Sequence, residues 1–300
     1  MIKIYSELVT ILLTIGAGII LRKFKIIKKE DAGVLLGLVF YITMPALILS
    51  KLPVANISYD YLYLPLIPIL VGIITYLAAR YFSGFLNLER KTMGVFIISA
   101  LILNTGFVMP FVVLYFGEEG LSRIMFLDVG NVLVVFLFAY YQACKYGNHQ
   151  VSNKQIALKF AGAIPIWAIF IALGMNYLKF RFLGPFGNFI NITGDLTIPL
   201  LLIGVGIFFT PALVKRKAMV LALFIRMGIG MLVGYFFVEL FNLEGLTRTV
   251  AILGTATPIG YNTLVFASVE NLDKEFAAAL VSTSILISLV YIPVIIYLNL

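Results

Sequence analysis

Long apolar segments follow one another along almost the entire chain, and they constrain its fold more than any other feature. Crossing the hydrocarbon of a bilayer takes about 20 apolar residues. Ten segments meet this requirement: approximately 6–22, 32–51, 61–83, 92–116, 122–145, 156–178, 188–211, 218–241, 246–268 and 274–298. The runs are continuous, whereas a barrel strand alternates over about ten residues. We therefore expect an all-α, polytopic membrane protein with ten transmembrane helices.

Composition excludes a soluble or disordered chain. Hydrophobic residues make up 62% of the 300 residues and charged residues only 12%, whereas a soluble domain is about half apolar and a quarter charged. A globule of this size has too little interior to hide so much apolar surface. The single histidine, His149, and the single cysteine, Cys144, provide neither a histidine cluster nor an intramolecular disulfide. We expect no catalytic residues, no metal and no cofactor.

The basic residues indicate orientation instead of nucleic-acid binding. They give a net charge of +8, but they lie in short runs between apolar segments, as membrane-flanking charges do. Of 22 Lys and Arg residues, Arg226 lies inside a segment, and six lie on the side of the termini: Lys3, Lys51, Arg123, Lys179, Arg181 and Arg248. The other fifteen lie in loops after odd-numbered segments. The positive-inside rule then predicts a multi-pass protein of the cell membrane with both termini outside.

The chain contains signs of an internal duplication. Thr43–Pro45 in segment 2 and Thr197–Pro199 in segment 7 share the pattern Thr-x-Pro at a shift of 154 residues. The same shift carries Asn104 in segment 4 onto Pro258 in segment 9. Five segments per half is an odd number, so the halves must cross the membrane with opposite orientation.

We therefore predict two inverted five-helix repeats. The first covers residues 1–150 and the second covers residues 151–300.

Segments 4 and 9 carry the strongest helix-breaking signals, at 104–110 and 257–263. Proline removes a backbone donor, and glycine lowers the cost of leaving helical geometry. Each break creates half-helix ends with opposed partial charges, of which the N-terminal end suits an anion. Two breaks meeting near the midplane would form a transporter site, with neutral polar groups from Asn104, Thr105, Thr257, Asn262 and Thr263. Ordinary kinked helices are the alternative.

Ionisable residues inside membrane segments are functional candidates because they are costly there. Asp128, with Asn131 one turn on, takes a proton, helps to hold a cation or pairs with a buried Arg, unless it is simply an acid near the outer rim. Ser282, Thr283 and Ser284 either line a cation site or bond backbone carbonyls. We expect Arg226 to reach the cytoplasmic surface or to pair with an acid, with substrate contact as the alternative. The coupling ion, if any, would be H+ or Na+.

These residues resemble the auxin efflux carrier family, which includes microbial malate or malonate permease-like members. The stretch from Lys29 to Pro45 resembles the second helix of the family, and Asn104-Thr105 followed by Val108-Met109-Pro110 is similar to its fourth. Pro258-Ile259-Gly260-Tyr261-Asn262 resembles the break in its ninth helix, and Arg226 and Pro293 also fit. The loop after segment 5, around 148–154, is short and favours a microbial member over an auxin carrier.

The resemblance implies a fold like that of bile acid:sodium symporters. Helices 4 and 9 would be broken and cross, helices 1, 2, 6 and 7 would form a scaffold, and helices 3–5 and 8–10 would move as an elevator. Asn104 and Thr105 would contact a substrate carboxylate. The full set expected to bind the substrate is Asn104, Thr105, Gly106, Pro110, Thr257, Pro258, Gly260 and Asn262. The set expected at an ion site is Asp128, Asn131, Ser282 and Thr283.

The function that these features favour is secondary transport of a small organic carboxylate. An intramembrane aspartyl protease would need Tyr-Asp and Gly-x-Gly-Asp, but Asp128 follows Leu127, and Asp195 lacks the second motif. A channel is the remaining alternative, although rings of like charge are absent. The sequence leaves open the substrate, the coupling ion, the direction of transport and whether the chain forms a homodimer.

Overall fold

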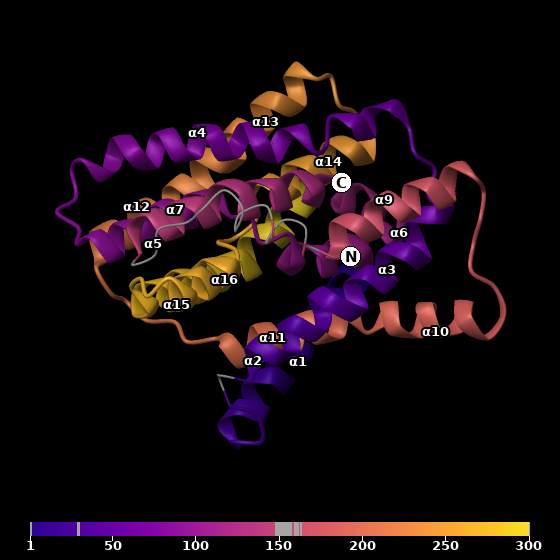
Figure 1. Ribbon diagram of the computed structural model, residues 1–300, viewed down its shortest axis with the longest axis horizontal. Coiled ribbons are helices and arrows are strands. Elements are labelled where there is room, and N and C mark those ends of the chain that lie inside the picture. Colours follow the sequence, from indigo (N-terminus) through magenta and orange to yellow (C-terminus); the bar gives the residue numbers. More distant parts are fainter. Residues whose placement is uncertain (1, 29–30, 148–157, 159–161, 163, 300) are drawn as a thin grey trace. The chain divides into compact units, whose positions relative to one another are not determined.

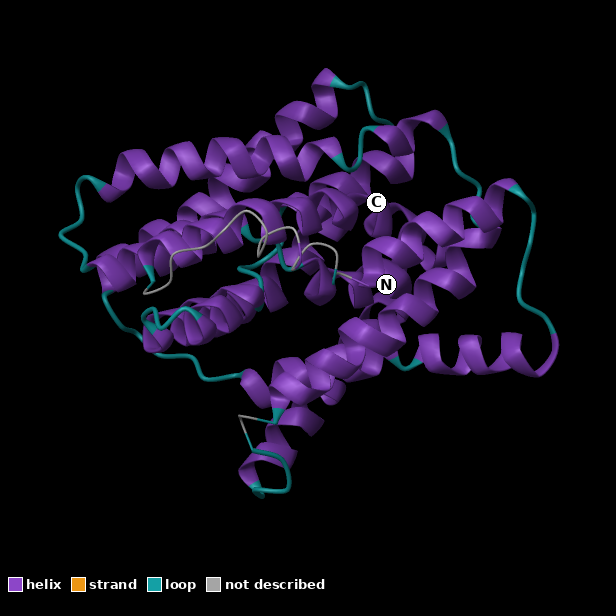
Figure 2. Cartoon of the chain, viewed as in Figure 1, coloured by secondary structure: helices purple, strands orange, loops and turns teal. Residues whose placement is uncertain are grey.

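The computed structural model describes residues 2–28, 31–147, 158, 162 and 164–299. Over these residues the chain is helical, and no strand occurs (Figure 2). The short loop at 148–154 lies outside them. The principal α-helices are α1 (Ile2–Lys23), α2 (Ala32–Leu38), α3 (Met44–Lys51), α4 (Leu66–Ser83), α5 (Arg90–Leu101), α6 (Thr105–Leu133), α7 (Tyr140–Tyr146), α9 (Ile164–Tyr177), α10 (Gly184–Asp195), α11 (Thr197–Phe208), α12 (Arg216–Leu223), α13 (Gly230–Leu240), α14 (Gly245–Thr255), α15 (Asn262–Val269) and α16 (Lys274–Asn299) (Figure 1).

Several helices are joined end to end by segments of different winding. The π-helical segments are η1 (Val39–Thr43), η4 (Val134–Ala139) and η5 (Phe224–Ile229), and the 3₁₀ turns are η2 (Leu52–Val54) and η3 (Tyr59–Leu62). Within α6 the chain changes direction at Gly117, whose φ of 62° and ψ of −152° are not helical. A positive φ is easily adopted only by glycine, so Gly117 separates the end of segment 4 from the start of segment 5.

Five helical stretches in the described parts of the chain are long and apolar enough to cross a membrane. They are Tyr59–Ser83, Thr105–Tyr146, Gly184–Phe208, Arg216–Leu240 and Lys274–Leu298. Val39–Val54 and Ile164–Tyr177 are shorter apolar helices. The all-helical, membrane-embedded class is therefore confirmed. The count of ten spans stays a prediction, because segments 4 and 9 are interrupted and are not single long helices.

The helices form two compact units. The first consists of Met1–Ser58, Met109–Met125 and Gly162–Phe209. In this unit α1 packs on α11, and α3 packs on α9 and α10. A Cβ at Gly206 would lie 2.0 Å from the carbonyl oxygen of Ile15, so only glycine permits the close approach of α1 and α11.

The second unit consists of Tyr59–Val108, Phe126–Ala161 and Thr210–Leu300. In it α4 packs against α5 and α13, α13 packs against α14, and α15 runs beside α16 (Figure 1). Gly234 of α13 allows a close approach to α14, since a Cβ there would overlap the Thr255 side chain. Each unit takes segments from both halves of the chain, so the units do not coincide with residues 1–150 and 151–300.

Candidate functional site: two interrupted helices joined by backbone hydrogen bonds

Asn104 lies in the first interruption, and Pro258 and Gly260 lie in the second, whereas Gly106 and Pro110 lie inside α6 and do not break it. α5 ends at Leu101, the backbone is extended at Ile102 (φ −89°, ψ 114°), and α6 starts at Thr105. α14 ends at Thr255, and α15 starts at Asn262. Asn104 caps α6, because its side-chain Oδ1 accepts a hydrogen bond from the Phe107 backbone amide at 3.2 Å.

The two interruptions pair with each other as a single antiparallel bridge. The Asn104 amide donates to the Pro258 carbonyl at 3.2 Å, and the Gly260 amide donates to the Ile102 carbonyl at 3.0 Å. Leu103 and Ile259 face each other between these bonds. Gly260 is required here, because a Cβ would lie 2.4 Å from the Ile102 side chain and 2.7 Å from the Leu103 carbonyl oxygen.

The backbone groups of Leu103 and Ile259 point away from the bridge, as in any pair of this type, and polar side chains satisfy them. The Leu103 amide donates to Asn131 Oδ1 at 3.1 Å, and Asn131 Nδ2 donates to the Leu103 carbonyl at 3.4 Å. The Ile259 amide donates to Ser284 Oγ at 3.1 Å. Asn104 Nδ2 donates to the Ile259 carbonyl at 3.1 Å. Extended backbone at membrane depth is tolerated only when satisfied in this way.

We call the two paired interruptions, residues 102–104 and 256–261, the crossing. Polar side chains of these residues are buried within it. Asn104 is 3% exposed and Thr257 0%, and the Thr257 hydroxyl also accepts from the Asn104 amide at 3.2 Å. Tyr261 interacts with the Asn104 side chain. Thr263, in the first turn of α15, is fully buried, and its hydroxyl has no hydrogen-bond partner among the described residues. This hydroxyl, next to the crossing, is therefore able to form a further hydrogen bond.

Asp128 joins the crossing through two hydrogen bonds. Its Oδ1 accepts from the Thr105 hydroxyl at 2.6 Å and from Asn131 Nδ2 at 2.9 Å. No Lys or Arg in the described chain lies within ion-pair distance of this carboxyl. The structure therefore brings Asp128 and Asn131 together beside the interruption before α6, and their expected role at an ion site stays a prediction.

Arg226 does not reach the surface, and it pairs with no acid among the described residues, so neither of the favoured expectations for it is supported. Its side chain is 0% exposed. Nη1 donates to the Ala100 carbonyl at 3.3 Å, and Nη2 donates to the Thr255 carbonyl at 2.5 Å. These carbonyls lie in the last turns of α5 and α14, where a helix leaves carbonyls without intrahelical partners. The sequence could not show this, because the acceptors are ordinary backbone atoms.

The remaining predicted residues fall in different places. Gly106 follows Thr105 in α6, and Asn262 begins α15. Pro110 lies inside α6 in the part that belongs to the first unit, and nothing shows it at the crossing. Ser282 Oγ accepts from the Thr210 amide at 3.0 Å, and Thr283 is half-buried. In the same run, the Ser284 hydroxyl contacts the crossing through the Ile259 amide.

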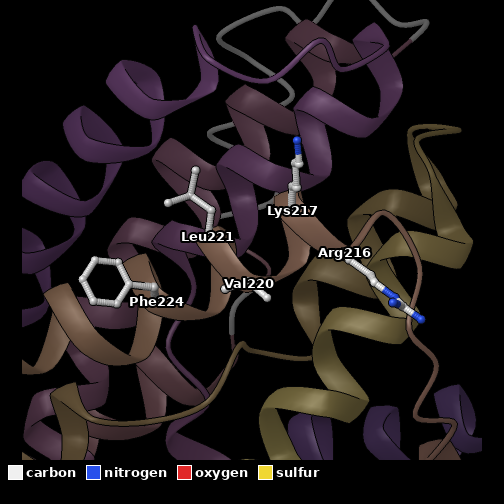
Figure 3. A pocket seen from close by; sticks show the side chains of 5 residues that line it. All are labelled: Arg216, Lys217, Val220, Leu221 and Phe224. Carbon is white, nitrogen blue, oxygen red and sulfur yellow. The ribbon is translucent and has the colours of Figure 1, made fainter.

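A groove elsewhere in the second unit does not involve these residues. It has a volume of about 520 Å³ and lies along α12. Val220, Leu221 and Phe224 line it, with Arg216 and Lys217 at the start of the helix (Figure 3). Val220 and Phe224 are 66% and 54% exposed, which is expected of side chains that face lipid.

Apolar helices of membrane length, together with two interrupted helices that satisfy each other's backbone, define a polytopic membrane protein with a polar crossing in its interior. The chain belongs to the membrane transport protein family, which includes the auxin efflux carriers; the family model matches residues 3–296. The family resemblance predicted from the sequence is confirmed.

Two archaeal relatives match nearly the whole chain. An uncharacterized transporter of Methanocaldococcus jannaschii is 27% identical over 299 residues, covering 94% of each chain. An uncharacterized transporter of Methanothermobacter thermautotrophicus is 25% identical over 296 residues, covering 96% of each. The protein is thus similar throughout its length to membrane transporters.

Proposed function

We propose that this protein is a secondary transporter that moves a small organic carboxylate by alternating access of the elevator type. The observation that carries the proposal is the hydrogen-bonded crossing of two helix interruptions, one from each half of the chain. A membrane protein retains irregular backbone at depth only where function or burial requires it. Family membership makes an enzyme a poor alternative.

The carboxylate is proposed to bind where α15 begins. The first N–H groups of a helix lack intrahelical partners, and the helix dipole there favours an anion. Thr263 offers an unpaired hydroxyl on this turn, and Asn262 is only half-buried. Asn104 lies next to this end through its bond to Ile259. Thr105 can contribute only if its hydroxyl turns away from Asp128.

The moving part is proposed to be the group of expected helices 3–5 and 8–10, which carries the crossing. Expected helices 1, 2, 6 and 7 are proposed as the scaffold. Support comes from the first compact unit, which contains the corresponding ranges Met1–Ser58 and Gly162–Phe209, together with Met109–Met125 from expected helices 4 and 5. We also retain as proposals ten spans in two inverted repeats, residence in the cell membrane, and both termini outside.

The test is uptake of labelled malate or malonate into liposomes that contain the purified protein. A carrier saturates with substrate and exchanges internal for external label, whereas a channel does neither. Asn104→Ala should lower initial uptake about 10- to 100-fold, since a hydrogen bond to a charged group contributes about 1.5–3 kcal/mol. Thr263→Val, which keeps the volume and removes only the hydroxyl, should lower uptake by a smaller factor.

Asn87→Ala is the matched control, because Asn87 lies exposed in the loop between α4 and α5. It should leave uptake unchanged. Melting temperatures of all variants separate loss of transport from loss of folding. Normal uptake by well-folded Asn104→Ala and Thr263→Val would reject the crossing as the binding site.

A further inference from the structure

Arg226 is the one side chain of the described residues that donates hydrogen bonds to the C-terminal ends of both interrupted helices. Its guanidinium reaches Ala100 on α5 and Thr255 on α14 with different nitrogens. It lies on the π-helical segment η5, a kind of winding that often occurs at functional sites. Gly230, one turn on, leaves room for it, because a Cβ there would lie 2.7 Å from Nη2.

Among the described residues the guanidinium of Arg226 donates to two backbone carbonyls, and its Nε has no hydrogen-bond partner. The C-terminus of a helix behaves as about half a negative charge, so two helix ends together offset about one positive charge. No Asp or Glu of the described chain lies within ion-pair distance of the guanidinium. A guanidinium is always protonated in proteins. The Tyr291 hydroxyl nearby donates to the Met227 carbonyl and supplies no negative charge.

Carbonyls at the C-terminal ends of two interrupted helices are the groups that bind a small cation in other broken-helix transporters. In this chain a covalently attached cation already contacts them. We propose that Arg226 is a built-in counter-cation that takes the place of a bound Na+ at these ends, so that transport does not depend on Na+. This inference rests on the proposed transport function and assigns its ion dependence.

The test compares melting temperatures of purified protein in sodium chloride and in choline chloride at equal ionic strength, without substrate. The wild-type melting temperature should be the same in both salts. Arg226→Met should melt about 5–10 °C lower in choline, because the carbonyls lose charged donors. Sodium should then raise the melting temperature of Arg226→Met saturably, because the vacated carbonyls are free to accept a cation.

Arg226→Lys, which keeps the charge, should remain insensitive to sodium. Arg216→Met is the matched control, since Arg216 is exposed at the start of α12, and it should behave as wild type. If Arg226→Met cannot be purified, Arg226→Gln takes its place in the comparison. Saturable stabilisation of the wild type by sodium would overturn the inference, as would an Arg226→Met melting temperature that sodium does not change.

The two proposals fail separately. An absence of carboxylate uptake would reject the proposed function. The melting experiment needs no substrate, so it would still test the role of Arg226. Conversely, wild-type uptake that requires a sodium gradient would contradict the built-in cation and leave carboxylate transport intact.

Discussion

The position of Asp128 constrains how an anion could bind at the crossing. Its carboxyl shares Oδ1 between Thr105, the first residue of α6, and Asn131. An ionised carboxylate here would repel a substrate carboxylate at the same crossing, and the repulsion is strong where water is scarce. A proton on Asp128 would remove it. If the proposed carboxylate binds at the crossing, we therefore expect its entry to be coupled to a proton.

Asp128→Asn tests this coupling directly. An amide has the size of the carboxyl but cannot ionise, so uptake by the variant should stay constant within about twofold between about pH 6.5 and pH 8, where the dicarboxylate substrate is itself almost fully ionised. Wild-type uptake should rise as the pH falls. The measurement is initial uptake into liposomes with equal pH on both sides, and Glu118→Gln, at an exposed acid, is the control. A pH profile of Asp128→Asn that matches the wild type would remove Asp128 from the proton path.

Sequence reasoning found some of these residues and missed others for a physical reason. Asn104 and Pro258 are conspicuous because a membrane helix accommodates such residues poorly, and the chain breaks at both. The role of Arg226 depends on carbonyls that are 126 and 29 residues away. Ser284 stood in a run of three hydroxyls, and only folding decides which of them reaches the Ile259 amide. Backbone partners leave no mark on a sequence.

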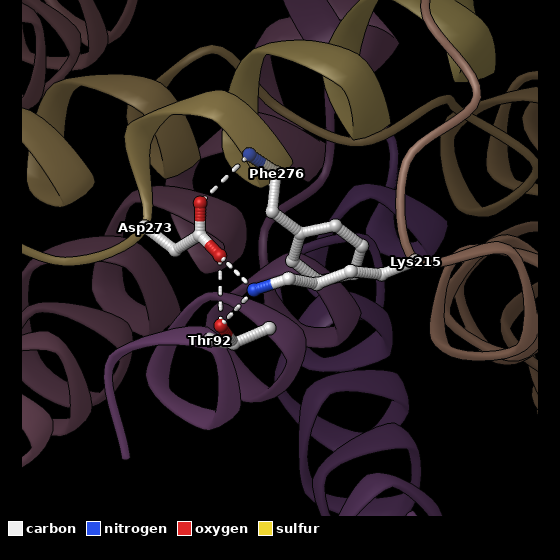
Figure 4. Close-up of polar contacts among 4 residues, drawn as sticks. All are labelled: Thr92, Lys215, Asp273 and Phe276. Carbon is white, nitrogen blue, oxygen red and sulfur yellow. Dashed lines mark hydrogen bonds and ion pairs between the residues drawn. The ribbon is translucent and has the colours of Figure 1, made fainter. Parts of the chain in front are cut away.

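At the scale of elements, a polar cluster holds the start of α16 to its neighbours (Figure 4). Asp273 Oδ1 accepts from the Phe276 amide at 3.0 Å, which caps α16. Its Oδ2 accepts from Lys215, which precedes α12, and from Thr92 of α5, at 2.6 and 2.7 Å. Partial burial opposes ionisation, but the ammonium, amide and hydroxyl donors outweigh it, so the pKa of the Asp273 carboxyl is lowered from its usual value.

A lowered pKa means that the cluster stabilises the fold at neutral pH and loses this contribution in acid. The contribution is complete above the unfolded-state pKa of about 3.9, and it disappears as the pH falls through the lower folded-state value. Asp273→Ala should cost about 1 kcal/mol at pH 7, as the loss of an N-cap does. Asp273→Asn should cost less, because an amide oxygen still caps the helix but no longer pairs with Lys215.

Melting temperatures from pH 7 down to pH 3 measure both effects. The difference between wild type and Asp273→Ala should shrink toward the acid end of the range. A constant difference over the whole range would show that the charge of Asp273 contributes nothing to stability.

The positions of many elements follow from the apolar pattern, but their winding does not. The Thr-x-Pro pattern marks a local irregularity in both halves: η1 ends at Thr43, and α10 gives way to α11 at Thr197. The hydroxyls of both threonines are buried and unpaired among the described residues. The π-helical segment η4 contains no proline or glycine, and η5 contains only Gly228 of these two types, so the sequence gives little sign of either change in winding.

At the scale of the whole molecule, the chain interleaves its halves. Each compact unit draws on residues before and after position 150, and the two halves contribute one helix interruption each to the second unit. Two tandem five-helix domains would instead keep each half to itself. This mixing of the two halves is compatible with the proposed inverted repeats, and the orientation of equivalent loops in the membrane tests them.

Inverted repeats place equivalent loops on opposite sides of the membrane. Asn56 follows expected span 2 and Leu213 follows expected span 7, and both are exposed. With both termini outside, a cysteine at position 56 should react with a membrane-impermeant maleimide in intact cells. A cysteine at position 213 should react only after the cells are permeabilised. Cys144→Ala provides a background without thiols, since Cys144 is the only cysteine.

A second pair, Asn87→Cys and Asn242→Cys, should show the reverse order, inside for the first half and outside for the second. Parallel halves would place equivalent loops on the same side of the membrane. Labelling of both members of either pair from the same side would therefore exclude the inverted repeat.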